Sequence, residues 1–269
     1  MSAFDGKVVA ITGASEGIGA ELARQLAAPG VRLALCARNA ERLEAVAAEC
    51  RTLGAEPLAL RADVGVETDC RAFVEGAAGK FGALDVLVNN AGMSGHATFE
   101  EVKDFGWYEA LMRVNYFGSL WCTRYALPHL RARRGLVVGI SSLAARTGVP
   151  GRTAYGPSKA AQALFFEALR VELRGSGVDV TIVYPGVVAT DIRRRGYGPD
   201  GRPAGASGLD ERGAMPVEEC ARQIAAAMAS RRRELVMTAQ GRIGLWVKMV
   251  APGLVDRMAA AALRKTGSE

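Results

Sequence analysis

The feature that most constrains the fold is a regular alternation of short apolar runs and longer helical stretches. Runs such as VVAIT and LVVGIS have no polar side, which is typical of strands covered by helices on both faces. Repeated strand–helix–strand order favours one parallel, doubly wound α/β sheet. The expected strands are 7–12, 32–37, 56–62, 84–89, 136–141, 179–184 and 234–237, and the expected helices are 17–28, 39–53, 66–81, 104–132, 153–175 and 216–230.

No linker, repeat or low-complexity stretch divides this pattern, so residues 1–240 are expected to form a single domain. The segment 191–215, after the sixth strand, is rich in Gly, Pro and Arg. Long irregular loops inside compact domains usually serve function, so we expect it to meet the substrate. Residues 241–269 are expected to form a basic, amphipathic extension that Pro252 divides into two helical pieces.

Charge and aromatic content argue against nucleic-acid binding. Residues 1–230 carry 26 basic and 25 acidic side chains, whereas residues 231–265 carry 8 basic and 2 acidic ones. The body is therefore nearly neutral, and no recognisable nucleic-acid module accompanies the basic tail. Aromatic residues make up 6% of the chain, too few for a base-stacking platform.

The remaining composition predicts a cytoplasmic protein without a metal site. Its five cysteines are scattered without a CxxC pair, which indicates reduced thiols that fill the core. His96 and His129 have no neighbours at ligand spacing. We expect no secretory signal before the first strand and, because no apolar run approaches ~18 residues, no membrane span.

A glycine-rich turn, TGASEGIG, joins the first strand to the first helix. Gly13 would allow the tight turn, Gly17 the approach of a phosphate, and Gly19 close packing of the helix on the strand. The helix would then present unpaired N–H groups to an anion. Because this turn lies in a strand–helix–strand unit, it predicts a dinucleotide site.

Further motifs follow in order: Asp63-Val64 after the third strand, NNAG over 89–92, Tyr155 and Lys159 as YxxxK, and Pro185-Gly186 after the sixth strand. Together with TGxxxGxG they resemble the short-chain dehydrogenase/reductase family, over almost the whole chain. The resemblance implies a Rossmann fold, NAD(P) as cofactor and a homodimer or homotetramer joined through 104–132 and 153–175. The cofactor contacts it implies are Gly13, Ser15, Glu16, Gly17, Ile18, Gly19, Arg38, Asp63, Val64, Asn90, Ala91, Gly92, Tyr155, Lys159, Pro185, Gly186, Val188 and Thr190.

The preferred cofactor depends on the residue that meets the ribose 2′ position. Arg38 follows the second strand, where a base would pair with the 2′-phosphate of NADP(H). We therefore expect NADP(H) to be preferred over NAD(H). Glu16 argues in the opposite direction, because an acid there would repel the phosphate.

The predicted chemistry is the exchange of a hydride between the nicotinamide and a carbonyl or secondary alcohol. Tyr155 and Lys159 are four residues apart on a helix and share a face, so the ammonium is expected to favour the phenolate. Tyr155 would be the general acid and base. The resemblance gives Ser142 the role of orienting the substrate and Asn115 that of holding a water in a proton relay through Lys159.

The substrate stays open at the level of sequence, because family resemblance sets the reaction type alone. Apolar residues with Trp246 and a basic rim in 241–265 resemble the C-terminal extensions of relatives that reduce lipophilic ketones. We therefore expect a hydrophobic, lipid- or steroid-like substrate, and a tail that contacts a membrane, the substrate cleft or a sister subunit. Alternatives are a 3-oxoacyl-carrier-protein reductase, whose acidic carrier Arg193, Arg194 and Arg195 could meet, and a catalytically silent dinucleotide-binding regulator.

Overall fold

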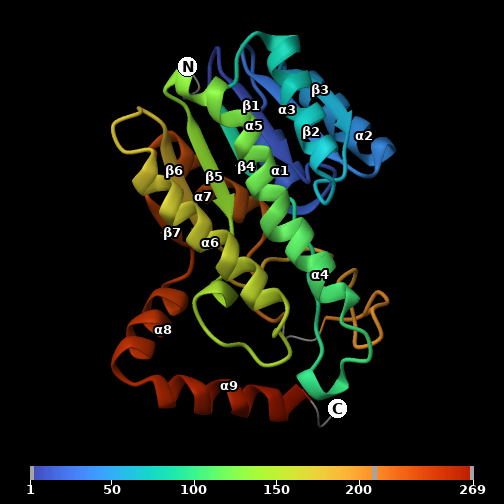
Figure 1. Cartoon of the computed structure of the whole chain (residues 1–269), viewed down its shortest axis with the longest axis vertical. Coiled ribbons are helices and arrows are strands. Elements are labelled where there is room, and N and C mark those ends of the chain that lie inside the picture. The colour runs from blue at the N-terminus through green and yellow to red at the C-terminus, as the bar shows by residue number, and fades with distance from the viewer. Residues whose placement is uncertain (1–2, 208–210, 267–269) are drawn as a thin grey trace.

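A computed structural model describes residues 3–207 and 211–266, with the backbone alone described for 262–266. In these ranges seven parallel strands form one sheet in the order β3-β2-β1-β4-β5-β6-β7 (Figure 1). The expected doubly wound parallel sheet is confirmed. The strands are β1 Val8–Thr12, β2 Arg32–Ala37, β3 Glu56–Arg61, β4 Val86–Asn89, β5 Leu136–Ile140, β6 Asp179–Tyr184 and β7 Glu234–Val236.

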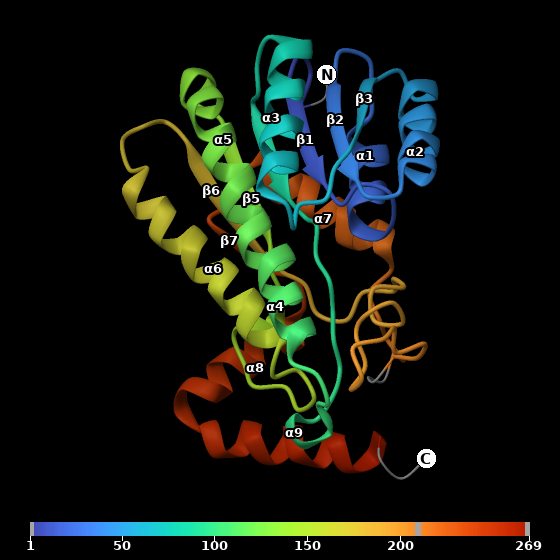
Figure 2. The same ribbon diagram turned by 45° about the vertical axis from the view of Figure 1, so that its right-hand side comes forward.

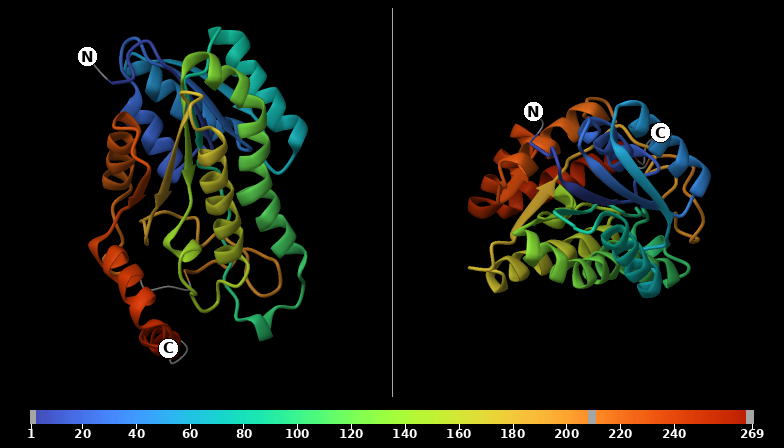
Figure 3. Two further views of the ribbon diagram at one scale, coloured as in Figure 1. Left: turned by 60° about the vertical axis from the view of Figure 1, so that its left-hand side comes forward. Right: turned by 90° about the horizontal axis from the view of Figure 1, so that it is seen from above.

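Helices cover both faces of the sheet (Figure 3). One layer contains α1 Gly17–Leu26, α2 Ala40–Thr52 and α7 Val217–Ala229, and the other contains α3 Glu67–Phe81, α5 Gly118–Arg133 and α6 Tyr155–Glu172. Successive side chains of a strand point to opposite faces, so β1 contributes Val9 and Ile11 to one core and Val8 and Ala10 to the other. Burial of these apolar residues on both sides is the main force that holds the layers together.

The helix expected over 104–132 is interrupted. It consists of α4 Gly106–Met112 and α5, joined by a π-helical turn over Arg113–Phe117 that contains Asn115. A π turn inserts one extra residue into the helical repeat, and such turns are frequent at functional sites. No glycine or proline marks this insertion, which explains why the hydrophobic pattern predicts an unbroken helix.

The order of the strands reverses between β1 and β4, and the crevice outside such a point is where α/β sheets bind ligands. The loops that follow β4, β5 and β6 gather at this end of the sheet (Figures 1 and 2). Two further helices, α8 Ala239–Val250 and α9 Pro252–Thr266, lie beyond these loops, and short 3-10 helices occur at Phe99–Glu101 and Leu143–Ala145. Among the described residues, no helix combines the length and apolar character that crossing a membrane requires.

Gly139 of β5 shows how closely the layers approach. A Cβ at this position would lie 2.3 Å from the ring of Phe166 on α6, and Phe166 is fully buried. Because the ring already occupies the space of the missing side chain, a larger residue would push α6 away from the sheet.

We expect Gly139→Ala to lower the free energy of unfolding by about 1–3 kcal/mol, because the added methyl overlaps the Phe166 ring. Gly79→Ala is the matched control: Gly79 lies within α3 with no atom near its missing Cβ, so the change should stabilise by about 0.5–1 kcal/mol. Urea unfolding of both variants measures the difference. Equal effects of the two substitutions would contradict this packing argument.

Candidate active site

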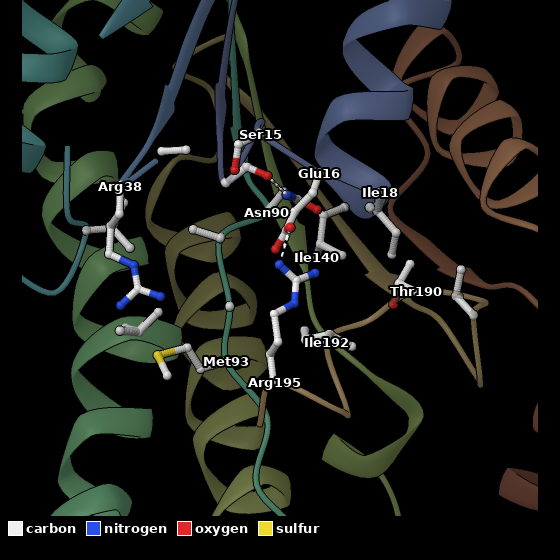
Figure 4. A pocket seen from close by; sticks show the side chains of 18 of the residues that line it. Ser15, Glu16, Ile18, Arg38, Asn90, Met93, Ile140, Thr190, Ile192 and Arg195 are labelled. Carbon is white, nitrogen blue, oxygen red and sulfur yellow. Dashed lines mark hydrogen bonds and ion pairs between the residues drawn. The ribbon is translucent and has the colours of Figure 1, made fainter. Parts of the chain in front are cut away.

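A cavity of about 390 Å³ opens at the carboxyl ends of the central strands (Figure 4). Side chains or backbone from the glycine turn, the NNAG segment, the YxxxK helix and the loop after β6 line it. Among the described residues, the lining lacks only two of the predicted site residues, Gly19 and Asn115, and both are buried. Residues that the sequence interpretation missed include Cys36, Asn39, Arg42, Ala62, Met93, Val114, Ile140 and Ile192.

The glycine turn packs directly on the loop after β4. Gly13 has φ +66°, and a Cβ there would lie 2.7 Å from the Ala91 Cα. A Cβ on Gly19 would lie 2.4 Å from the Gly13 carbonyl oxygen. The Asn90 Nδ2 donates to the carbonyl oxygens of Thr12 and Gly13, at 2.9 and 3.1 Å. These contacts require glycine and hold the turn in a fixed place beside the NNAG segment.

The N-terminus of α1 is open to an anion. Glu16 is its N-cap residue, but its side chain makes no capping hydrogen bond, so the first N–H groups of the helix have no side-chain acceptor. Gly17 has φ +53° and faces the side chain of Thr190. This bare, positively polarised helix end fits a dinucleotide pyrophosphate.

Two arginines stand where the ribose 2′ position is expected. Arg38 follows β2 and is exposed to the cavity, and Asn39 caps α2 by accepting from the backbone N–H of Arg42 at 2.9 Å. The cap places Arg42 in the first helical turn, beside the cavity. Sequence reasoning missed Arg42, although its position four residues after Arg38 was a usable signal.

Glu16 is balanced by cations. Its carboxylate pairs with Arg42 at 3.0 Å and also with Arg195, which reaches it from the loop after β6 (Figure 4). Glu16 and its two guanidinium partners together carry a net positive charge, so this part of the cavity is positive rather than negative. The repulsion of a 2′-phosphate that Glu16 suggests from sequence is therefore offset by its neighbours.

The arginine run 193–195 does not form an exposed binding patch. Arg193 is buried and donates to the Glu211 carboxylate at 2.7 Å and to the Val188 carbonyl at 2.8 Å. Arg195 pairs with Glu16, which leaves Arg194 exposed. The first and third arginines thus hold the loop against the cavity, because burial of a guanidinium requires a partner. Residues 208–210 of this loop lie outside the described residues.

The four predicted catalytic residues come from three places in the fold. Tyr155 begins α6, Ser142 follows β5 and accepts from the Ala144 N–H at 3.1 Å, and Asn115 lies in the π turn. The Asn115 side chain binds both backbone groups of Met93, and it also donates to the Ser158 hydroxyl at 2.9 Å. Asn115 is therefore fully occupied and fixes the loop after the NNAG segment.

Lys159 is a buried residue that lines the cavity. Its ammonium donates to the Ile140 carbonyl at 2.8 Å and contacts the Gln162 side-chain oxygen at 3.3 Å. Removal from water disfavours the charged form and lowers the Lys159 pKa to about 7. The neighbouring Ser141 donates its hydroxyl to the Lys159 carbonyl at 2.9 Å.

The electrostatics around Tyr155 differ from the expectation. Burial raises the Tyr155 pKa, whereas hydrogen bonding with Ser142 and the positive charges of Arg152 and Arg193 lower it. The sequence interpretation attributed the lowering to Lys159. It missed Arg152, although a position three residues before Tyr155 was a usable signal.

The family of the chain follows from comparison with known proteins. The family model described as short chain dehydrogenase matches residues 7–197. The chain belongs to the short-chain dehydrogenase family. Among solved structures, an alcohol dehydrogenase from the archaeon Thermococcus sibiricus, complexed with 5-hydroxy-NADP, is 26% identical with a TM-score of 0.75 and covers 86% of this chain and 95% of its own. A dehydrogenase/reductase from Sinorhizobium meliloti is 30% identical with the same TM-score, covering 87% and 94%.

Curated relatives in this family carry the name 11-beta-hydroxysteroid dehydrogenase. The Arabidopsis thaliana protein 1A is 45% identical over 193 residues, 71% of this chain and 55% of the relative. The Sesamum indicum protein A is 37% identical over 261 residues, 93% of this chain and 74% of the relative. The match to the 11-beta-hydroxysteroid dehydrogenase-like 4A of Arabidopsis thaliana spans 62% of that protein, so this chain covers less than two thirds of several relatives.

Proposed function

We propose that this protein is an oxidoreductase that interconverts a carbonyl and a secondary alcohol, with NADP(H) as its preferred cofactor. The observation that carries the proposal is one cavity lined by the glycine turn, the NNAG segment, Ser142, Tyr155 and Lys159. When bound, the nicotinamide ring would supply or accept the hydride. The protein's own contribution is to bind, orient and exchange a proton.

Each proposed catalytic residue has a defined role in the exchange of the proton. The Tyr155 hydroxyl gives a proton to the carbonyl oxygen in reduction and takes the alcohol proton in oxidation. The Ser142 hydroxyl donates to the same substrate oxygen and stabilises the charge that develops on it. Lys159 would meet the cofactor ribose and relay protons. Asn115 supports this arrangement through its hydrogen bonds to Met93 and Ser158.

We expect Tyr155→Phe to abolish turnover while leaving cofactor binding intact, because the phenol exchanges the proton without being needed to hold the nucleotide. The measurement is the absorbance of the reduced cofactor on a panel of ketones, with fluorescence titration of NADPH for binding. Equal turnover in wild type and Tyr155→Phe would overturn the assignment. Wild-type protein that binds NADPH but reduces no member of the panel would favour the catalytically silent regulator.

The proposed preference for NADP(H) rests on Arg38 and Arg42, which flank the expected position of the 2′-phosphate. Arginine pairs well with phosphate because its planar fork offers two donors. The Asn39 cap fixes the backbone of Arg42 at the start of α2, and the ion pair with Glu16 restricts its side chain beside the cavity.

Arg38→Ala and Arg42→Ala should each weaken NADPH binding about tenfold or more, since a charge-assisted hydrogen bond contributes about 1.5–3 kcal/mol. NADH binding should change little. Arg51→Ala, at the far end of α2, is the control and should affect neither cofactor, because Arg51 pairs with Glu44 away from the cavity. A tighter wild-type affinity for NADH than for NADPH would refute the preference.

We further propose that the substrate is hydrophobic, of lipid- or steroid-like size. Met93 and Ile192 line the cavity (Figure 4). Tyr155 packs in a cluster with Trp107 and Tyr197. The names of the curated relatives support a polycyclic alcohol or ketone. Small polar ketones that outperform polycyclic ones would count against the proposal, and turnover of a 3-oxoacyl thioester would favour the carrier-protein reductase.

The protein is also proposed to be cytoplasmic, because its five cysteines are free and buried, as in a reducing compartment.

The C-terminal segment supports a peripheral contact with a membrane. Helices α8 and α9 expose an apolar surface in which the Trp246 side chain is 67% exposed. Arg242, Lys248 and Arg257 are exposed on the same two helices, and such basic residues beside apolar ones suit anionic lipid headgroups. The exposed apolar residues are Ile243, Trp246, Met249, Val250, Leu254 and Met258. The division into a domain 1–240 and an extension 241–269 stays a prediction, and residues 267–269 lie outside the described range, as do the side chains of Ala262 and Arg264.

Vesicles with anionic lipid should co-sediment with the wild-type protein, and the Trp246→Ser, Met249→Ser double variant should bind several-fold more weakly, because interfacial binding follows the apolar area buried. Leu53→Ser, which removes an exposed leucine directly after α2, is the control and should bind like wild type. Co-sedimentation with neutral and with anionic vesicles, at one salt concentration, measures the binding of the wild type, the double variant and the control. Binding that ignores the double substitution would place the contact elsewhere.

The protein is also proposed to form homodimers or homotetramers through α5 and α6. Phe117, Leu164 and Val171 are exposed there, an apolar surface that a second copy would cover. Analytical ultracentrifugation would decide, and a monomer at micromolar concentration would exclude this arrangement.

A further inference from the structure

Arg152 places a buried cation against the ring of Tyr155. Its guanidinium carbon lies 5.8 Å from the ring centroid, and the residue is 5% exposed. One terminal nitrogen donates to the Ser94 hydroxyl at 2.7 Å and to the Gly95 carbonyl at 3.0 Å. No carboxylate of the described residues lies within ion-pair distance of Arg152. Because burial of an unpaired charge is costly, this arrangement calls for a physical explanation.

The other charged or titratable groups near Tyr155 are neutral or balanced. Arg193, from the loop after β6, pairs with Glu211 at 2.7 Å. Lys159, on α6 itself, has its pKa lowered to about 7 by burial and is therefore partly uncharged at neutral pH. His96, from the loop after β4, has its pKa lowered by burial and by Arg152, so it is neutral. Ser142 contributes a neutral hydroxyl.

We propose that Arg152 is a positioning residue for the proton-exchange step: its charge holds the Tyr155 ring and favours the phenolate over the phenol. The proposal rests on the proposed function of Tyr155. A guanidinium is charged at every pH at which the protein is folded, so it stabilises a nearby anion continuously. An electron-rich phenolate ring also attracts a cation more strongly than a phenol ring does.

The hydrogen bonds of Arg152 keep its charge in place. They tie the segment before α6 to the loop after β4, and a bridge between Arg152 and Ala97 joins the same two segments. The chain thus buries a cation beside the ring by satisfying the donors of one terminal nitrogen with a hydroxyl and a carbonyl, which neutralise none of its charge. A carboxylate partner in the same place would have cancelled the effect on Tyr155.

The test separates the charge of Arg152 from its hydrogen bonds. Arg152→Gln removes the charge but keeps an amide donor for Ser94 and Gly95, whereas Ser94→Ala removes one hydrogen-bond partner but keeps the charge. Arg194→Gln is the control, since it removes an exposed charge from the substrate loop. The readout is the titration of Tyr155 by NMR in protein labelled at the tyrosine ring carbon, with Tyr155→Phe to assign the signal.

We expect the Tyr155 pKa to rise by about one unit or more in Arg152→Gln and to stay within a few tenths of a unit in Ser94→Ala and Arg194→Gln. The sign follows from the charge: removing a cation disfavours the anion, so a higher pH is needed to ionise the phenol. An unchanged pKa in Arg152→Gln, or an equal rise in Ser94→Ala, would reduce Arg152 to a structural residue.

A kinetic arm links the titration to function. In the oxidation of a secondary alcohol with NADP⁺, the acidic limb of kcat/KM should move to higher pH by the same amount in Arg152→Gln and stay in place in Ser94→Ala. The titration needs no substrate. A wild type without alcohol oxidation would therefore refute the proposed function, while the NMR result would still decide the effect of Arg152 on Tyr155.

Discussion

Every functional part of this protein is placed relative to one backbone contact, that between the glycine turn after β1 and the loop after β4. The missing Cβ of Gly13 and that of Gly19 leave space that the Ala91 backbone and the Gly13 carbonyl occupy, at distances no side chain would tolerate. The contact lies where the strand order reverses, which is the point at which the crevice forms. It also fixes the position at which α1 begins. The cavity walls then follow from strands whose positions the sheet already determines.

Charge in the cavity is controlled by burial and by pairing. Glu16, a carboxylate at the proposed phosphate site, has two arginine partners, and Arg193 is balanced by Glu211. Lys159 has no such partner and responds by a lowered pKa. Arg152 also has no carboxylate partner among the described residues, and a guanidinium cannot give up its proton in the same way. Charged groups in and beside this cavity are thus accommodated in three ways: by an ion pair, by a lowered pKa, and by hydrogen bonds to uncharged groups.

The end of the molecule that holds the cavity is also where it exposes apolar surface. The loops after β4, β5 and β6 and the helices α8 and α9 lie at this end (Figure 2). A hydrophobic substrate that partitions into a bilayer would meet the protein from the same side. The proposed membrane contact and the proposed substrate class therefore support each other, although each is tested separately.

The sequence by itself determined the elements that depend on local pattern. Unbroken apolar runs predicted a parallel sheet covered on both faces, and the spacing of Gly13, Gly17 and Gly19 predicted the turn. Seventeen of the positions named for cofactor contact line the cavity, because motifs at strand ends gather automatically at one edge of a parallel sheet.

Tertiary structure alone decided which charges meet. Arg195 reaches Glu16 across 179 positions of sequence, and Arg152, three residues before Tyr155, is buried because the chain before α6 folds back against Ser94 and Gly95 in the loop after β4. The π turn that holds Asn115 likewise has no sequence signature, since it is stabilised by hydrogen bonds to Met93 and Ser158 from other segments. Periodicity records which side of an element is buried. Partners of a buried charge depend on how separate segments come together in space, and no local pattern encodes that.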